Sequence, residues 1–161
     1  IADAAQVSVG ILQHNFRTRD ALLLAAFETA VSRVEQSVNS FAGTTKEAIK
    51  EFAIDALPLD RERQTEWKVM VAFRAEALSS SSLAREQRSR WRKFRQLFKS
   101  AIEAGISTGN ISKNVDSEKA SYAILAAIDG TAMLSLFLNK DWNRAEQSSS
   151  LEAMIDRALS R

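Results

Sequence analysis

The scarcity of residues that interrupt helices constrains the fold of this chain more than any other feature of its sequence. Only five Gly and one Pro occur in 161 residues. Gly and Pro mark most turns, whereas Ala, Leu, Glu, Lys, Arg and Gln, which dominate here, lose little on entering a helix. The sequence therefore predicts an all-α fold.

Residues that typically cap, break or follow helices divide the chain into predicted helical segments. Apolar residues recur at helical spacing over 18–41, and Gly43 is a candidate C-terminal cap. Thr44 and Glu47 form an S/T-x-x-E capping box that predicts the start of the next helix, and Pro58 predicts its end. The remaining predicted helices are 61–78, 83–104, 116–138 and 151–160, the last capped by Ser148 or Ser150.

Composition limits the chemistry open to the chain. The absence of Cys and the single His exclude a disulfide framework, a thiolate zinc site and a Cys nucleophile. No G-x-S-x-G elbow or phosphate loop occurs, which leaves only a carboxylate pair open as an active site. We therefore predict a protein that is not an enzyme and that needs no metal or cofactor. The net charge of +2 identifies no partner by itself.

Targeting and membrane segments are not expected. Residues 1–5 have neither a basic region nor the apolar stretch of a secretory signal. The longest apolar run, 123–138, has 16 residues and contains Asp129 and Gly130, so it is shorter than the roughly 20 residues that span a bilayer. We interpret it as a buried helix and expect a cytoplasmic protein.

Residues 2–23 have the pattern of a helix-turn-helix. The hydroxyl of Ser8 can cap the second helix of this motif. Gly10 lies in the first turn of that helix, where the missing side chain lets the backbone approach a phosphate or a base edge. Thr18 can cap the long helix that follows, whose positive N-terminus beside Arg19 suits a DNA phosphate. This pattern favours DNA binding.

The same stretch resembles the TetR family of bacterial transcription regulators. The family signature is A-G-V-S-x-G-x-[LI]-x-x-x-F-x-[ST]-[KR]-[DE]-x-L-L. Eleven residues match it: Ala5, Val7, Ser8, Gly10, Leu12, Phe16, Thr18, Arg19, Asp20, Leu22 and Leu23. Residues 11–14 are similar to the branch that contains choline-sensing regulators of betaine synthesis. The motif covers the first 24 residues, and the rest of the chain resembles the family only by its helix pattern.

The resemblance implies an all-α protein of two domains. Residues 1–24 would be the remnant of a helix-turn-helix DNA-binding domain that continues into a connecting helix to about 41, and 44–161 would form the effector-binding and dimerisation domain. The implied function is a repressor that binds double-stranded operator DNA as a homodimer and is released by a small apolar or amphipathic inducer. The residues implied at the DNA surface are Ser8, Val9, Gly10, Gln13, His14 and Arg19.

The chain also departs from the family pattern. Gln6 stands where the family has a turn Gly, and Gln13 and Asn15 replace usual phosphate-contacting positions. The sequence begins inside the first helix of the helix-turn-helix, so we expect this chain alone to bind operator DNA poorly. These departures support an alternative function, a helical small-molecule or partner-binding module that no longer reads DNA.

An inducer pocket is predicted in the second part of the chain, where large apolar residues could otherwise fill an ordinary core. Asp129 favours a pocket because it interrupts an apolar run, and a buried carboxylate needs a partner. That partner is either the Arg74 guanidinium or a cationic ligand surrounded by aromatic rings. The predicted ligand-binding residues are Trp67, Met70, Phe73, Arg74, Phe94, Phe98, Asp129 and Met133.

The last two predicted helices carry apolar faces with two interpretations. They could form a four-helix interface in a homodimer, or they could close the core of the monomer. The resemblance favours the dimer, because two recognition helices that read successive major grooves must be held about 34 Å apart. The residues on these faces are Ala123, Ala127, Met133, Leu134, Phe137, Leu151, Met154, Ile155 and Leu159.

Basic residues also form a stripe on the predicted helix 83–104. Their spacing places five side chains on one face: Arg85, Arg88, Arg92, Arg95 and Lys99. A second nucleic-acid contact and a solvated face that pairs with acidic residues are both open. Charge runs are usually of the second kind, which we favour here.

Overall fold

The computed structural model describes residues 16, 18–138 and 141–160 of the chain. These residues form six α-helices and no strand, which confirms the all-α prediction. The helices are α2 (Arg19–Ser40), α3 (Lys46–Asp55), α4 (Arg61–Ala77), α5 (Ser81–Ser107), α6 (Ser117–Leu138) and α7 (Arg144–Ala158).

Threonine hydroxyls cap the first two of these helices. Thr18 caps α2 as predicted, and its Oγ1 accepts a hydrogen bond from the Ala21 backbone N–H at 3.1 Å. The α3 helix begins one residue later than predicted, because Thr45 rather than Thr44 accepts the hydrogen bond from the Ala48 N–H. The predicted capping box at the start of α3 is therefore wrong by one position.

The last helix begins earlier than predicted. Neither Ser148 nor Ser150 caps it, because Asn143 accepts a hydrogen bond from the Glu146 N–H while the Glu146 side chain accepts one from the Asn143 N–H. This reciprocal box satisfies two N–H groups that would otherwise lack a partner at the helix start. The extra turns bring Gln147 into the buried face of α7.

Gly43 does not cap the C-terminus of α2. The helix ends at Ser40, and Phe41 follows in extended backbone with φ −71° and ψ 119°. A Cβ atom on Gly43 would lie 2.5 Å from the Cβ atom of Ala48, so the glycine instead lets the connection pass close to α3. Among the described residues the glycine with a positive φ, 80°, is Gly109 in the turn after α5.

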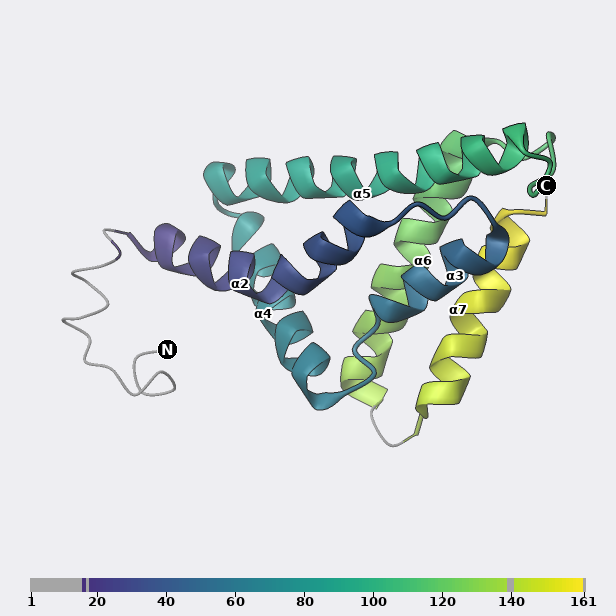
Figure 1. Cartoon of the computed structure of the whole chain (residues 1–161). Coiled ribbons are helices and arrows are strands. Elements are labelled where there is room, and N and C mark those ends of the chain that lie inside the picture. Colours follow the sequence, from purple (N-terminus) through teal and green to yellow (C-terminus); the bar gives the residue numbers. More distant parts are fainter. Residues whose placement is uncertain (1–15, 17, 139–140, 161) are drawn as a thin grey trace.

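The longest helix, α5, has 27 residues and runs along one side of the molecule. Figure 1 shows α5 across the top, with α2, α4 and α6 beneath it and α7 toward the end that carries the C-terminus. α5 packs on α4 and α6, α2 packs on α4 and α5, and α3 packs on α7. This arrangement brings side chains from five helices, α2 to α6, around one interior space.

The predicted buried helix 116–138 corresponds to α6, which is buried on one side only. By length and composition alone α6 could cross a membrane, but only 33% of its most apolar stretch is buried. It packs between α5 and α7 and buries polar side chains, including Ser121, Thr131 and Ser135. A helix in this position is part of the core of the fold.

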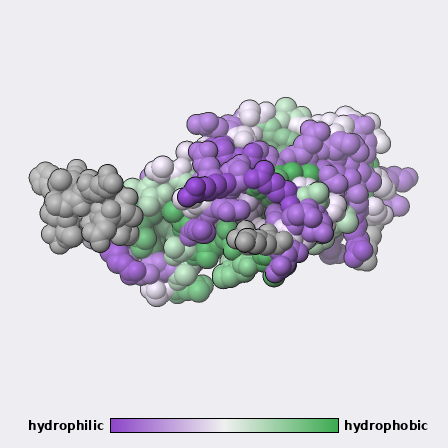
Figure 2. Space-filling model, turned by 90° about the horizontal axis from the view of Figure 1, so that it is seen from below, coloured by the Kyte–Doolittle hydropathy of each residue, from purple (hydrophilic) through white to green (hydrophobic). Residues whose placement is uncertain are grey.

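The predicted dimer face divides into a core part and an exposed part. Leu151, Ile155 and Leu159 are completely buried and close the monomer's own core, so their assignment to an interface is wrong. Leu134 and Phe137 are 52% and 79% exposed. The exposed apolar residues on α6 and α7 also include Tyr122, Met133, Leu138 and Met154. Figure 2, a view from below, shows hydrophobic surface along the lower edge of an otherwise largely hydrophilic face.

Candidate functional site

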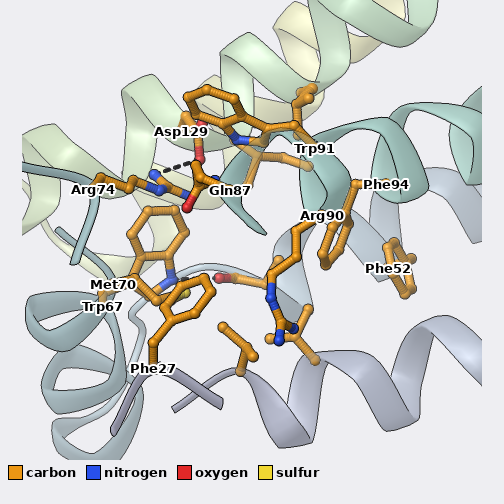
Figure 3. A pocket seen from close by; sticks show the side chains of 15 residues that line it. Phe27, Phe52, Trp67, Met70, Arg74, Gln87, Arg90, Trp91, Phe94 and Asp129 are labelled. Atoms are coloured by element: carbon orange, nitrogen blue, oxygen red, sulfur yellow. Dashed lines mark hydrogen bonds and ion pairs between the residues drawn. The ribbon is translucent and has the colours of Figure 1, made fainter. Parts of the chain in front are cut away.

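A small cavity of about 60 Å³ lies in the space enclosed by α2 to α6. Aromatic rings form much of its wall: Phe27 comes from α2, Trp67 from α4, and Trp91 and Phe94 from α5 (Figure 3). Four polar side chains also line the cavity: Arg74, Gln87, Arg90 and Asp129. An apolar cavity with a few convergent polar groups is the usual form of a small-molecule site.

Arg74 and Asp129 form an ion pair at the edge of the cavity. Arg74 Nη1 lies 3.1 Å from Asp129 Oδ1, and the two side chains are 22% and 26% exposed. The carbon of the guanidinium lies 5.2 Å from the ring centroid of Trp67 and 5.6 Å from that of Trp91. The guanidinium is therefore within cation–π distance of both indoles. Of the two partners that the sequence leaves open for Asp129, the structure contains Arg74.

Burial raises the pKa of Asp129 above its ordinary value of 3.8. Desolvation of the carboxylate is the largest effect and outweighs three opposing ones: the charge of Arg74 and the hydrogen bonds from Arg74 and Trp91. A raised pKa means that the ionised carboxylate is held at a cost in the folded protein, even with its partner present. The pair thus remains sensitive to anything that changes its surroundings.

Three buried polar atoms at the cavity form no hydrogen bond among the described residues: Arg74 Nε, Gln87 Oε1 and Arg90 Nε. Arg90 Nε still has a carboxylate beside it, because it lies 3.0 Å from Glu86 Oε1 in an ion pair. Within the described part of the chain, Arg74 Nε and Gln87 Oε1 have no such neighbour. A buried polar atom without a partner costs about 1–3 kcal/mol, so a ligand that supplied hydrogen bonds to Arg74 and Gln87 would recover part of that cost.

Five of the eight predicted ligand-binding residues line the cavity: Trp67, Met70, Arg74, Phe94 and Asp129. The other three do not. Phe73 is 1% exposed and stacks on Phe27, with ring centroids 3.9 Å apart. Phe98 is completely buried and packs edge-on against Phe52. Met133 is 37% exposed and lines a surface groove instead.

The residues that the sequence interpretation missed include Trp91, Phe27, Gln87 and Arg90. Gln87 and Arg90 interrupt the buried stripe of α5 that includes Leu83 and Phe98, and that interruption is the same signal that identified Asp129. It could have found them. Phe27 carries no such signal, because it is an ordinary apolar residue on the buried face of α2.

The residues predicted at the DNA surface are mostly outside the described part of the chain. Ser8, Val9, Gly10, Gln13 and His14 lie there. The sixth, Arg19, is the first residue of α2, is 71% exposed and pairs with Glu76 of α4.

The start of α2 is also tied to the start of α5. The carboxylate of Asp20 accepts hydrogen bonds from Ser80 at 2.6 Å and Ser82 at 3.0 Å. The Ser80 bond is the largest effect that lowers the pKa of Asp20. The N-terminus of α2 is thus connected both to α4, through Glu76, and to the beginning of α5.

The basic stripe of α5 divides into a paired and an unpaired part. Arg95 and Lys99 form ion pairs with Glu118 of α6, as expected for a face that neutralises acidic residues. Arg88 and Arg92 are exposed and form no ion pair within the described part of the chain. Among the described residues, no acidic side chain neutralises Arg88 and Arg92, in contrast to Arg95 and Lys99.

Replacing Asp129 by Asn is expected to change how stability depends on pH. A raised pKa contributes stability that is complete below the ordinary value of 3.8 and is lost as the pH rises through the folded-state value. The parent should therefore lose stability relative to the D129N variant as the pH rises above about 4. Urea unfolding of both proteins at several pH values measures this difference. A difference that stays constant or grows in favour of the parent would contradict the assignment.

Comparisons with known proteins agree with this architecture. A model of the C-terminal domain of BetI-type transcriptional repressors matches residues 45–160. No curated protein matches the chain in sequence. A transcriptional regulator from Rhodococcus sp. Rha1 superposes with a TM-score of 0.86 at 26% identity, over 99% of this chain and 82% of that one.

More distant structures share the fold. A TetR regulator from Haloarcula marismortui superposes with a TM-score of 0.78 at 20% identity, over 99% of this chain and 82% of that one. FadR from Bacillus subtilis, solved in complex with stearoyl-CoA, has a TM-score of 0.72 at 18% identity, over 98% and 85% of the two chains. The matched family model covers most of the chain and describes regulators, not enzymes. The chain therefore belongs to the TetR family of transcriptional regulators, and its C-terminal domain is of the BetI type.

Proposed function

We propose that the protein is a cytoplasmic repressor that binds operator DNA as a homodimer and is released by a small apolar or amphipathic molecule. The DNA-binding domain would comprise residues 1–24 and continue along α2 to about 41, and 44–161 would bind the effector and form the dimer. The observation that carries this proposal is the cavity, which lies on the same helix, α4, as the ion pair to Arg19.

Few residues separate the cavity from the start of α2, which directly follows most of the residues predicted to contact DNA. Arg74 lines the cavity, and two residues further along α4 Glu76 pairs with Arg19 at the start of α2. A ligand that moved Arg74 would disturb α4 within one turn of Glu76. A ligand shifts an equilibrium between two states only if it makes different contacts in each of them. A movement of Arg74 that disturbs the Arg19–Glu76 pair would make the DNA-binding state and the released state differ in this way.

The size of the cavity supports two states. Its volume of about 60 Å³ is well below the roughly 300–1,000 Å³ of typical ligand sites. An inducer would therefore have to displace wall residues on entering. Because packed interiors transmit such displacements, the enlarged cavity would correspond to a different arrangement of α4 and α5.

The exposed apolar residues of α6 and α7 support the homodimer. Replacing Phe137, which is 79% exposed, by Glu should raise the dimer dissociation constant at least about 30-fold, because a central aromatic contact is worth about 2 kcal/mol or more. Sedimentation velocity over a dilution series measures the shift. Gln96→Glu is the control, because Gln96 is exposed on α5 in a groove lined only by α2, α5 and the connection after α2. A dimer equally stable in both variants would contradict this interface.

Operator binding should depend on the residues that the family places at DNA. In a protein that carries the whole helix-turn-helix, Gly10→Arg blocks close approach of the backbone, and Arg19→Glu puts a negative charge beside a phosphate. We expect each change to weaken operator binding at least about tenfold in a fluorescence-anisotropy titration.

A charge reversal at another helix start provides the control. Arg61→Glu alters the first residue of α4, which is exposed. It should leave operator binding nearly unchanged. If the Gly10 and Arg19 variants bind operator as well as the parent does, the repressor function is wrong. The departures at Gln6, Gln13 and Asn15 would then favour a helical binding module that does not read DNA.

A further inference from the structure

Trp91 separates the cavity from the surface. Its side chain lines the internal cavity and also a groove of about 400 Å³ on the outside between α5 and α6. Leu125 and Asp129 are the other two residues common to both spaces. The two spaces are therefore divided by a wall that is one side chain thick.

The Trp91 side chain is the part of the cavity wall that can move outward most easily. Trp91 is 39% exposed and its hydrogen bond goes to Asp129, a side chain that is itself partly exposed. Trp67, on the opposite side of Arg74, is 3% exposed and donates a hydrogen bond to the backbone carbonyl of Ala56 at 2.7 Å. A cavity that holds a benzene ring measures about 150 Å³, more than twice the volume present here. A ring-sized ligand thus needs Trp91 to move outward, and that movement joins the cavity to the groove.

The charges along this route favour an anion. Arg88 and Arg92 line the groove, are exposed and form no ion pair with any residue that the structure describes. On the cavity side, the partnerless Arg74 Nε is a donor on a cation. The carboxylate on the route, Asp129, is already neutralised by Arg74. Positive charge without an acidic partner among the described residues therefore faces a ligand on the groove side of Trp91, and an N–H donor without a partner faces it on the cavity side.

We propose that the inducer is an amphipathic carboxylate whose ring-sized apolar end occupies the cavity and whose carboxylate lies in the groove against Arg88 and Arg92. This inference rests on the proposed function, which places the inducer in the cavity. It also assigns a role to Arg88 and Arg92, two of the three stripe residues that form no ion pair with any described residue. A neutral molecule with the same apolar end would fill the cavity but leave both arginines unmatched.

Three compounds with one apolar end test this proposal: 4-phenylbutyrate, 4-phenylbutan-1-ol and 4-phenylbutylamine. Trp67 and Trp91 both line the cavity, so intrinsic tryptophan fluorescence of the intact chain reports binding. We expect the acid to bind at least about tenfold tighter than the alcohol, and the amine to bind most weakly. Equal binding of acid and alcohol, or tightest binding of the amine, would overturn the proposal.

Paired variants locate the carboxylate. Replacing Arg88 and Arg92 together by Gln should weaken binding of the acid at least about fivefold and leave that of the alcohol within about twofold. The control replaces Arg85 and Lys93 by Gln, which removes the same charge from exposed positions of α5 outside the groove. Equal losses in both pairs would show only general attraction and would overturn the site.

A failure of the carboxylate proposal is distinguishable from a failure of the proposed repressor function. If the alcohol binds as tightly as the acid, the ligand is not an anion, but the cavity still holds a ligand and the repressor function stands. If none of the three compounds changes the fluorescence, the carboxylate proposal fails. The DNA-binding function is judged separately, by the operator titrations with the Gly10 and Arg19 variants.

Discussion

Replacing Arg74 by Met is expected to lower the free energy of unfolding by about 3 kcal/mol at pH 7. The change leaves the Asp129 carboxylate largely buried without its cation and removes the contacts of the guanidinium with two indole rings. Both members of the pair are less than a third exposed, which keeps the expected loss at the lower end of the range for buried pairs. Urea unfolding at a fixed protein concentration measures it.

The double variant Arg74→Met with Asp129→Leu provides the control. Removing both charges leaves no unpaired group in the apolar surroundings, so the double variant should recover to within about 1 kcal/mol of the parent. A loss below about 1 kcal/mol in the single variant would show that solvent already screens Asp129. The ion pair would then contribute little to the free energy of unfolding.

Replacing Phe73 by Ala should lower the free energy of unfolding by about 4 kcal/mol. The side chain is 1% exposed and stacks on Phe27 with rings 6° from parallel, so its removal leaves a cavity in the core. Chemical denaturation measures the loss, with Leu78→Ala as the control on a residue that is 92% exposed. The control should cost no more than about 0.5 kcal/mol. A Phe73 variant of nearly parental stability but reduced ligand binding would instead restore the predicted role of Phe73 in the pocket.

Local capping rules predicted helix ends where one polar residue could act as cap. Thr18 is such a residue, and its side chain accepts a hydrogen bond from the Ala21 N–H as expected. At the start of α7 several residues satisfy the same rule: the predicted caps Ser148 and Ser150, and Asn143, which caps the helix in the structure. Competing caps are decided by which residues the helix then buries, and burial depends on packing against α6.

The cavity was predictable in part for a similar reason. Helical periodicity identifies the face of α4 that turns inward, and Trp67, Met70 and Arg74 follow from it. It does not tell which inward residue ends beside a space and which is covered by another helix. Phe73 does not line the cavity because α2 crosses over it and supplies Phe27, a contact between residues 46 positions apart. Such contacts arise from the crossing of helices, which the spacing of residues in one helix does not encode.

The same limit applies to the ion pairs. Asp129 interrupts an apolar helix and Arg74 lies on a buried face, so the sequence indicated each as a candidate partner of the other. In the structure Arg74 Nη1 lies 3.1 Å from Asp129 Oδ1. The pairing of Arg19 with Glu76 had no comparable signal, because both residues occur among other charges on exposed helix surfaces. The partner of a charged residue was predictable where the residue lay among apolar neighbours in the sequence. It was not predictable where the residue lay among other charged residues.

We propose that this regulator binds a specific DNA sequence as a dimer, and selection from sheared genomic DNA tests that proposal. The protein, carrying the family's whole helix-turn-helix, would be used at about 0.15 M salt, where specific and non-specific affinities differ by roughly 10³ or more. We expect recovery of a pseudo-palindromic site whose half-sites are about one helical turn, or a multiple of it, apart. Recovery of no preferred sequence from a folded dimer would contradict the repressor function and leave a ligand-binding helical module.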